Sequence, residues 1–271
     1  GFEFFRVVQK ELSDYFTQLL TDIVQKRIAE RFTRNDFLQQ FVSDNIEAIN
    51  KGLPPVHSYD DIAAHCVNFF LDGYNTSSIV LCFTMYQLAV NPEWQHRVRN
   101  EIKSMVENHT ELTYDILLEL SNMNMVISET MRLHPVVGTM TRRCTKTTSL
   151  VDEEGNSFNV EEGTPIAIPV YALHMDPQYY PSPEEFKPER FLNPSQDADQ
   201  RYTYLPFGEG PRICPGMKFG QMVVKACLAT ILLNFEILPT KPNQTVEPDL
   251  SNSFLHVAKG GVWLKFKPLQ N

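Results

Sequence analysis

The sequence predicts a mainly α protein with a small β region. Long helical segments occupy the first half of the 271 residues, and short runs rich in Thr, Val and Ile follow from Val136 to Pro169. A further apolar stretch of helical character, residues 215–235, comes directly after a cysteine in a loop of glycine and proline. Long apolar segments of helical period favour helices, whereas short β-branched runs between turn residues favour strands.

The helices are separated by polar or proline-containing breaks, such as KGLPPVHS at 51–58 and the pair Asn91-Pro92. Proline at a first helical position both ends one helix and starts the next. The predicted helices are 2–32, one from residue 34 onward with Asn35 or Asp36 as its N-cap, 59–90, one from Pro92, one or two between 112 and 133, and 215–235.

The β region is predicted in two places. Short strands and a hairpin with the turn EEGNS at 153–157 are expected between Val136 and Pro169. The tail FLHVAKGGVWLKFKP, residues 254–268, has a hairpin-like pattern around Gly260-Gly261. Residues 171–206 are rich in Pro, Tyr and Asp and are expected to be irregular.

Composition limits the class of protein. The formal net charge of -9 argues against a nucleic-acid partner. The five cysteines form no CxxC pair, so a zinc ribbon has no support, and their odd number favours a reducing compartment. Cys66, Cys82 and Cys227 lie in apolar helical segments and are predicted to be buried core thiols. No apolar run approaches transmembrane length.

The stretch FGEGPRICPG, residues 207–216, surrounds Cys214 with glycines, prolines and Arg212. Proline lacks a backbone donor and glycine allows unusual dihedral angles, so a shaped loop is predicted. A thiol directly before a helix N-terminus, with an arginine two residues earlier, favours the thiolate. The loop is predicted to present a thiolate ligand; the alternative is a structural cysteine in a Gly-Pro loop.

This loop resembles the haem-binding signature of the cytochrome P450 family. Its defining positions are Phe207, Gly210, Arg212, Cys214 and Gly216. The resemblance implies the C-terminal portion of the cytochrome P450 fold, with Cys214 as the axial thiolate ligand of haem b (iron protoporphyrin IX). It further implies that Arg212 pairs with a haem propionate and that Phe207 packs beside the sulfur.

The motifs ETMR at 129–132 and FKPERF at 186–191 match the family's Glu-Arg-Arg network. A glutamate and an arginine three residues apart share a helix face and can pair, although most such pairs alone are solvated surface ion pairs. The resemblance assigns Glu129, Arg132 and Arg190 to a structural network that holds the cysteine loop. Since buried charges need partners, loss of one is expected to disrupt the haem site.

The stretch FFLDGYNTSS at 69–78 matches the family's long central helix over the haem. The resemblance assigns Gly73 and Thr76 to the oxygen-binding groove, where Thr76 helps to deliver protons; the alternative is a Gly-Thr packing notch. Asn75 replaces the acid usual before this threonine, so proton delivery is expected to be slower or to run through water. Asp72 replaces a common alanine. Its carboxylate is a candidate for an ester to haem or, alternatively, for a hydrogen bond to water or substrate.

Two apolar segments match the family's substrate pocket. Val136, Val137 and Gly138 belong to a pocket-lining strand, and Phe254 and Leu255 to the last pocket-lining turn. Apolar strand residues are core by default, which is the alternative for all five.

Other polar residues receive roles from the resemblance. Arg142 either reaches a haem propionate or holds its strand, and His174 is expected to be structural rather than a metal ligand. The cations predicted to meet an acidic reductase, with solvated helix faces as the alternative, are Lys218, Lys225, Arg97, Arg99 and Lys103.

The resemblance covers essentially the whole chain, which corresponds to roughly the C-terminal half of the family's usual length. We therefore expect residues 1–271 to form a single partial domain, with the N-terminal half and the membrane anchor absent. The chain begins without methionine in what reads as a helix, which fits a piece of a longer protein. The amino-acid sequence looks most like that of microsomal, insect-type detoxifying members of the family.

The function implied is haem-thiolate monooxygenation, in which one atom of dioxygen enters an apolar small molecule. Electrons would come from NADPH through NADPH-cytochrome P450 reductase, with cytochrome b5 as a second partner, at the cytoplasmic face of the endoplasmic reticulum membrane. The alternative is a truncated, non-catalytic fragment or remnant. A haem-thiolate isomerase or dehydratase is opposed by the retained Thr76, and a helical scaffold by the fully matched cysteine loop.

Overall fold

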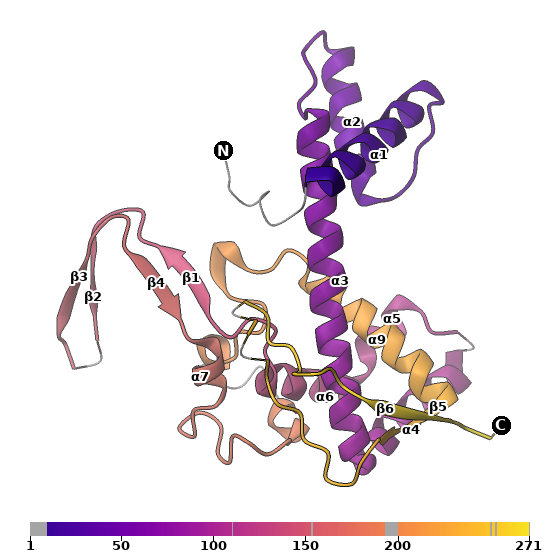
Figure 1. The fold of residues 1–271 in the computed structure, drawn as a ribbon, viewed down its shortest axis with the longest axis vertical. Coiled ribbons are helices and arrows are strands. Elements are labelled where there is room, and N and C mark those ends of the chain that lie inside the picture. The colour runs from indigo at the N-terminus through magenta and orange to yellow at the C-terminus, as the bar shows by residue number, and fades with distance from the viewer. Residues whose placement is uncertain are drawn as a thin grey trace. The chain divides into compact units, whose positions relative to one another are not determined.

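The computed structural model describes residues 10–109, 111–152, 154–192, 200–249, 251–252 and 254–270. These residues fall into two compact units, which meet in the chain between Asn75 and Thr76. Each unit is described by itself below (Figure 1). The prediction of a mainly α fold with a small β region is confirmed.

The first unit contains α1 (Lys10–Ala29), α2 (Phe37–Asn50) and the first part of α3 (Tyr59–Val90). Its core consists of Val24, Leu38, Val42 and Ile62. Asp36 is the N-cap of α2, because its Oδ1 accepts a hydrogen bond from Gln39 N at 3.0 Å. Of the two predicted caps, Asn35 and Asp36, the second is therefore the one observed. Residues 2–9 of the predicted first helix lie outside the described residues.

The second unit has the rest of α3 and the other long helices. Their bounds are α4 (Pro92–His109), α5 (Tyr114–Glu119), α6 (Ser121–Leu133) and α9 (Met217–Asn234). α4 packs against both α6 and α9, and their shared apolar core includes Val98, Ile102, Val126 and Leu228. Asn91-Pro92 separates α3 from α4 at the predicted position, since Pro92 needs no hydrogen-bond donor at a helix start.

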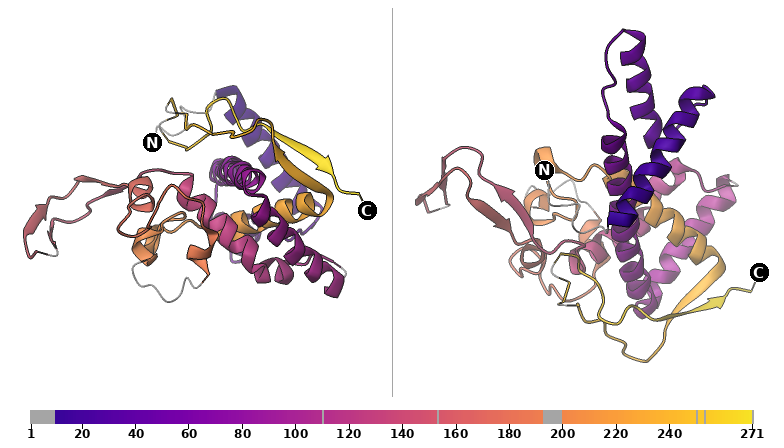
Figure 2. Two further views of the ribbon diagram at one scale, coloured as in Figure 1. Left: turned by 90° about the horizontal axis from the view of Figure 1, so that it is seen from below. Right: turned by 45° about the horizontal axis from the view of Figure 1, so that its top comes forward.

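Within the described ranges, the β region has three antiparallel strand pairs, which Figure 2 shows from two further sides. The pairs are β1 (Met140–Arg143) with β4 (Pro165–Ile168), β2 (Thr148–Val151) with β3 (Ser157–Val160), and β5 (Phe235–Pro239) with β6 (Leu264–Pro268). The turn between β2 and β3 closes through a hydrogen bond from Asp152 N to Asn156 O at 3.0 Å, as the predicted hairpin requires.

The hairpin predicted around Gly260-Gly261 is wrong. Both glycines have positive φ and make a turn, but β6 pairs with β5 rather than with the residues before the turn. Those earlier residues pair elsewhere, since Lys259 N donates to Glu247 O at 2.9 Å. A short alternating strand can be recognised locally, whereas its partner depends on the whole fold.

The segment 171–206 is less irregular than predicted. It carries α7 (Val170–His174), the 3₁₀ turn η2 (Pro188–Phe191) and α8 (Gln200–Thr203), while residues 193–199 lie outside the described residues. These elements are too short to show a helical period in the sequence.

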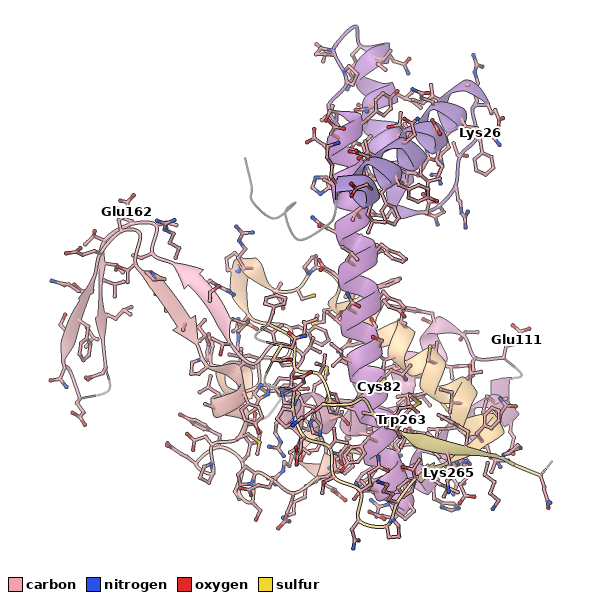
Figure 3. The ribbon with its side chains drawn as sticks, viewed as in Figure 1. Lys26, Cys82, Glu111, Glu162, Trp263 and Lys265 are labelled. Atoms are coloured by element: carbon pink, nitrogen blue, oxygen red, sulfur yellow. The ribbon has the colours of Figure 1, made fainter. Side chains whose placement is uncertain are left out.

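The prediction of three buried core thiols is also wrong. Cys82 is exposed on α3 (Figure 3), and Cys66 and Cys227 are only half-buried. An apolar helical segment indicates a helix, but it does not tell which of its faces is covered. Within the described part of the chain, no helix combines the length and the apolar character that crossing a membrane requires.

Candidate active site

The cysteine loop runs from Phe207 to Gly216 and turns back on itself. Cys214 N donates a hydrogen bond to Phe207 O at 2.8 Å, so the two ends of the motif are joined. Gly208 and Gly210 have φ of +73° and +78°, a conformation that L side chains rarely adopt. Between them and Cys214 lies the short 3₁₀ turn η3 (Gly210–Arg212). These glycines are therefore required by the backbone path that brings Cys214 to the start of α9.

The Cys214 side chain is exposed and lines a mainly apolar cavity of about 210 Å³. Helices α3, α6 and α9, the segment from α6 into β1, and the chain from Leu205 through the cysteine loop supply its walls. The lining residues are Thr76, Ser77, Val80, Ile127, Met131, Val136, Val137, Met140, Leu205, Pro206, Phe207, Gly208, Cys214, Gly220, Gln221 and Val224. The thiol thus opens into a space able to hold an apolar group.

Small residues allow the cavity walls to approach each other. A Cβ added at Gly220 on α9 would lie 3.7 Å from Ser77 Oγ on α3. A side chain longer than a methyl group would therefore crowd the contact between these two helices. A Cβ added at Gly208 would lie only 3.2 Å from Met140 Sδ on β1. The glycines therefore set how closely the loop and the helices surround the thiol.

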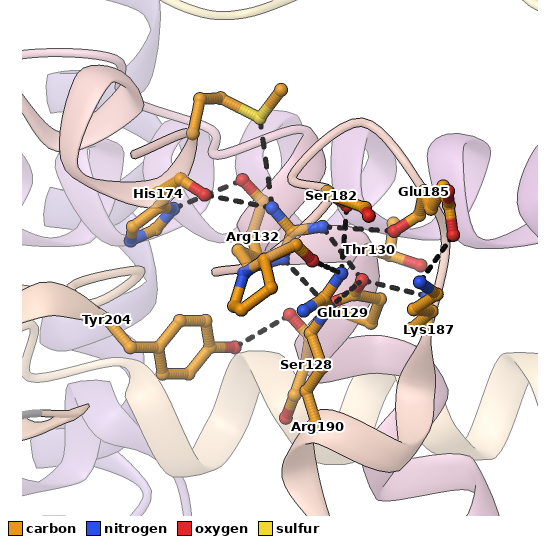
Figure 4. Close-up of polar contacts among 12 residues, drawn as sticks. Ser128, Glu129, Thr130, Arg132, His174, Ser182, Glu185, Lys187, Arg190 and Tyr204 are labelled. Carbon is orange, nitrogen blue, oxygen red and sulfur yellow. Dashed lines mark hydrogen bonds and ion pairs between the residues drawn. The ribbon is translucent and has the colours of Figure 1, made fainter. Parts of the chain in front are cut away.

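Glu129, Arg132 and Arg190 form a compact ion-pair network beside the loop (Figure 4). Arg132 donates two hydrogen bonds to the Glu129 carboxylate, from Nε at 2.7 Å and from Nη2 at 2.8 Å, and both side chains are fully buried. Arg190 Nε donates to Glu129 Oε1 at 3.3 Å. Fork-to-fork geometry of this kind gives strong charge-assisted hydrogen bonds.

Backbone groups complete the network. Lys187 N donates to Glu129 Oε1 at 2.9 Å, and Arg132 Nη1 donates to His174 O at 2.9 Å. Arg190 Nη2 donates to Pro181 O at 2.6 Å and to Ser182 O at 2.9 Å. The network thus connects α6 with the segment around residues 174–190, which leads toward the cysteine loop.

His174 continues this connection as far as the loop. Its Nδ1 donates to Arg132 O at 3.2 Å, and its Nε2 accepts from Leu205 N at 2.9 Å, two residues before Phe207. Burial lowers the pKa of the ring to about 4, so the imidazole is uncharged at neutral pH. Both ring nitrogens are used by the backbone, which agrees with the expected structural role and leaves neither available to a metal.

The structure brings some, but not all, of the predicted pocket residues to the cavity. Thr76, Val136 and Val137 line it together with Cys214 and Phe207. Among the described residues, the lining does not include Gly138, Phe254 or Leu255. Gly138 O accepts a hydrogen bond from Tyr171 N at 2.9 Å, and 71% of the Phe254 side chain is exposed.

Asp72, Gly73 and Asn75 lie on α3 within the first unit. Desolvation by the surrounding chain raises the pKa of the Asp72 carboxyl above its ordinary value. Their assignment to an oxygen-binding groove, like the ester proposed for Asp72, stays a prediction.

The arginines predicted near the haem propionates lie at the loop and on β1. Arg212 is exposed at the end of η3. Arg142 Nη1 donates to Thr141 O of its own strand at 2.9 Å, and its Nη2 lies 4.0 Å from the Cβ position of Gly208. Arg142 therefore lies next to the loop, and both predicted roles for it remain open.

Two of the five cations predicted to meet a reductase are buried, so that prediction is wrong for Arg99 and Lys225. Arg99 Nε donates to Leu232 O at 2.9 Å, and Lys225 Nζ donates to Leu117 O at 2.9 Å. Arg97, Lys103 and Lys218 are exposed. The sequence shows charge on a helix, but the covered face becomes clear only once the neighbouring helices are placed.

Several cavity residues were not identified from the sequence. Gly220, Gln221 and Val224 share one face of α9, at the spacing of residues three and four apart that places side chains together on a helix. That spacing was a usable signal. Met140 and Leu205 carry no comparable signal, because Met140 lies in a strand of four residues and Leu205 lies in the loop after α8.

The residues around Cys214 fit a haem group. A thiolate haem protein would need one cysteine thiol to hold the iron and an apolar space to hold the macrocycle. One exposed thiol on a mainly apolar cavity matches this need. A Cβ added at Gly210 would meet nothing within 4 Å, so open space lies beside the loop. The Cys214 thiol and the apolar lining of the cavity are therefore typical of one class of protein, the haem-thiolate proteins.

Comparison with known proteins places the chain within a family. The family model described as Cytochrome P450 matches residues 2–264, so the chain belongs to the cytochrome P450 family. It is 38% identical to cytochrome P450 3A9 of Rattus norvegicus over 96% of this chain. It is 35% identical to probable cytochrome P450 6a13 of Drosophila melanogaster over 98%, and 35% identical to cytochrome P450 6j1 of Blattella germanica over 99%. The chain spans 49%, 53% and 52% of these relatives, about half their length.

Proposed function

We propose that this chain contributes the thiolate side of a haem monooxygenase that inserts one atom of dioxygen into an apolar small molecule. The observation that carries the proposal is the opening of the Cys214 thiol onto a mainly apolar cavity between α3 and α9. Haem b, when bound, supplies the iron at which dioxygen is activated. Membership of the cytochrome P450 family supports the same reaction class.

The chain's own residues have distinct tasks in this proposal. Cys214 would hold the iron as a thiolate, Phe207 would cover the sulfur, and Arg212 would neutralise a propionate. Arg142 would either neutralise a propionate as well or hold its strand. Gly210, with its positive φ, would give the loop its path, and Gly216 would keep space beside the sulfur, since a Cβ there would lie 3.8 Å from Cys214 Sγ. Glu129, Arg132 and Arg190 hold the segments that lead into the loop, since they connect α6 to residues 174–190.

Proton delivery would involve the central helix. Thr76 lines the cavity, and its hydroxyl would pass a proton by hydrogen bonding. Asn75 has no titratable proton, so protons would pass through water or through Asp72. Gly73 would leave room for dioxygen, because it has no side chain. The lining residues Val136 and Val137 would exclude water and contact the apolar substrate.

The remaining partners follow from the family rather than from the cavity. Electrons would come from NADPH through NADPH-cytochrome P450 reductase, with cytochrome b5 as a second donor, at the endoplasmic reticulum membrane. The mainly apolar lining of the cavity supports a small, apolar substrate. The assembled cysteine loop and the buried Glu129–Arg132 pair speak against a decayed, non-catalytic remnant.

The test is the carbon monoxide difference spectrum of the reduced protein, recorded for this chain and for a version extended by upstream coding sequence. A thiolate-type Soret band in either is the expected result. A band in the extended protein alone would mean that haem uptake needs residues outside this chain. Absence of the band from both would overturn the proposal.

A further inference from the structure

Several helix ends among the described residues of the second unit lack a complementary charge of their own, and three of them receive one from a neighbouring helix. α9 and α5 have no basic residue in their last turns, and α6 has no acidic residue in its first turn. Leu120, which precedes α6, makes no side-chain cap. Helix C-termini favour cations and helix N-termini favour anions, so each of these ends gains from a charge supplied by another element.

Arg99 on α4 supplies the charge at the C-terminal end of α9. Its Nε donates to Leu232 O at 2.9 Å, and its Nη2 donates to Phe235 O at 2.9 Å. Gln95 orients the guanidinium, because its Oε1 accepts both from Arg99 Nη2 at 2.7 Å and from Ile237 N at 2.8 Å. Arg99 is 9% exposed, so these bonds are largely shielded from water.

Glu101, also on α4, supplies the charge at the N-terminal end of α6. Its Oε1 accepts from Asn122 N at 2.8 Å, and its Oε2 accepts from Met123 N at 3.1 Å. A carboxylate that binds two free backbone N–H groups acts as an N-cap from a neighbouring helix. The third end is served by Lys225 of α9, whose Nζ donates to Leu117 O in α5 at 2.9 Å.

α4 therefore holds the two helices on which the candidate site depends (Figure 1). α9 begins directly after the cysteine loop, with Met217 N donating to Cys214 O at 3.4 Å. α6 carries Glu129 and Arg132 near its other end. A helix of a few turns is stiff, so a shift at one end is transmitted to the other.

We propose that Arg99 and Glu101 are positioning residues, which set the place of the Cys214 thiol relative to the Glu129–Arg132–Arg190 network. Neither residue touches the cavity, and both act through the helices that they hold. This rests on the proposed function, because it concerns the same thiol. It goes further by assigning the control of thiol position to α4.

The test follows haem coordination and global unfolding in one urea titration. Haem-loaded wild-type protein is compared with Arg99→Met, Arg99→Lys and Glu101→Gln, and with Glu93→Gln as an exposed carboxylate control on the same helix. The thiolate-type band reports the Cys214 bond, and the fluorescence of the buried Trp94 reports unfolding. Only a positioning role predicts that the band is lost before the protein unfolds.

In Arg99→Met and Glu101→Gln, the thiolate-type band should disappear about tenfold faster than in wild type at urea concentrations where Trp94 fluorescence is still native, as expected for loss of a charge-assisted hydrogen bond at a buried helix end. Arg99→Lys should recover part of the loss, and Glu93→Gln should match wild type. If the band and the native fluorescence are lost at the same urea concentration in the variants, the proposal is overturned, and Arg99 and Glu101 have a purely structural role. If Arg99→Met does not fold, the results for Glu101→Gln and Arg99→Lys decide whether these residues position the thiol.

A second readout separates this proposal from the haem assignment. Amide hydrogen exchange at Gly220 N, which donates to Gly216 O at 2.8 Å, reports the order of the first turn of α9 without haem. If neither this chain nor its extended version shows a thiolate band, the proposed function fails. Faster exchange in Glu101→Gln and Arg99→Met than in Glu93→Gln would still support positioning by α4, and unchanged exchange would overturn it.

Discussion

The Cys214 side chain is exposed at the cavity and has no part in the apolar core. Cys214→Ser should therefore abolish the thiolate-type carbon monoxide band while changing the free energy of unfolding by less than about 1 kcal/mol. Cys82→Ser, another exposed thiol in the same unit, is the control and should keep the band. Retention of the band in Cys214→Ser would rule out this cysteine as the iron ligand.

Glu129 and Arg132 behave differently, because both are fully buried and depend on each other. Glu129→Gln leaves the Arg132 charge without its carboxylate, so the variant should lose about 3–5 kcal/mol of stability in urea unfolding. Arg97 and Glu189 form a pair at 3.4 Å with more than half of each side chain exposed. Glu189→Gln is the matched control and should cost about 0–1 kcal/mol. Equal losses in the two variants would contradict a special role for burial.

At the scale of the element, the cysteine loop depends on glycine for two separable reasons. Gly208 and Gly52 both have φ of +73°, but only Gly208 has a neighbour near its Cβ position, Met140 Sδ at 3.2 Å. Gly52→Ala should cost about 1 kcal/mol through backbone strain alone. Gly208→Ala should cost about 1 kcal/mol more, because the Met140 side chain has to move. Urea unfolding of both variants measures the difference.

The double variant Gly208→Ala with Met140→Ala tests the cause. When Gly208→Ala is added to Met140→Ala, it should cost only the backbone strain and not the additional cost of about 1 kcal/mol, because the crowded thioether is gone. If Gly208→Ala and Gly52→Ala lower the free energy of unfolding equally, the loop tolerates a methyl group at position 208. Packing against β1 then does not restrict the residue at that position.

The elements also show what local sequence can and cannot predict. Tyr59–Val90 and the start at Pro92 were predictable, because proline and helical period act within a few residues. The pairing of β6 with β5 was not, since the partner strand lies about thirty residues away in the chain and the turn at Gly260-Gly261 fits a local hairpin equally well.

For the molecule as a whole, the candidate site was predictable where the motif itself contains the chemistry. Cys214 and Phe207 lie on one cavity, and Glu129 and Arg132 lie in one ion pair, because their spacing in the motifs already restricts their geometry. Burial was not predictable in the same way. Arg99 looked like an exposed helix cation, and only the packing of α9 and β5 against α4 shows that it is enclosed.

The whole molecule should lose stability in mild acid through its buried histidines. Burial lowers the pKa of His174 to about 4 and that of His134 to about 3, whereas the unfolded chain has the ordinary value of 6.5. Below pH 6.5 the unfolded state therefore binds protons that the folded state does not, and the free energy of unfolding falls as the pH falls. The contribution of His174 is lost between pH 6.5 and about 4 and amounts to about 3 kcal/mol.

Urea unfolding at several pH values between 7 and 4, on wild type and His174→Gln, measures this contribution. The variant should be less stable at pH 7, because the bonds to Arg132 O and Leu205 N are perturbed, but its stability should fall less steeply with acid. His96→Gln, on an exposed position of α4, is the control and should keep the wild-type slope. Parallel curves for His174→Gln and wild type would show that another group controls the acid sensitivity. A shallower slope would mean that the uncharged His174 ring, held between α6 and the segment leading into the cysteine loop, connects the stability of the protein to the pH around its candidate haem site.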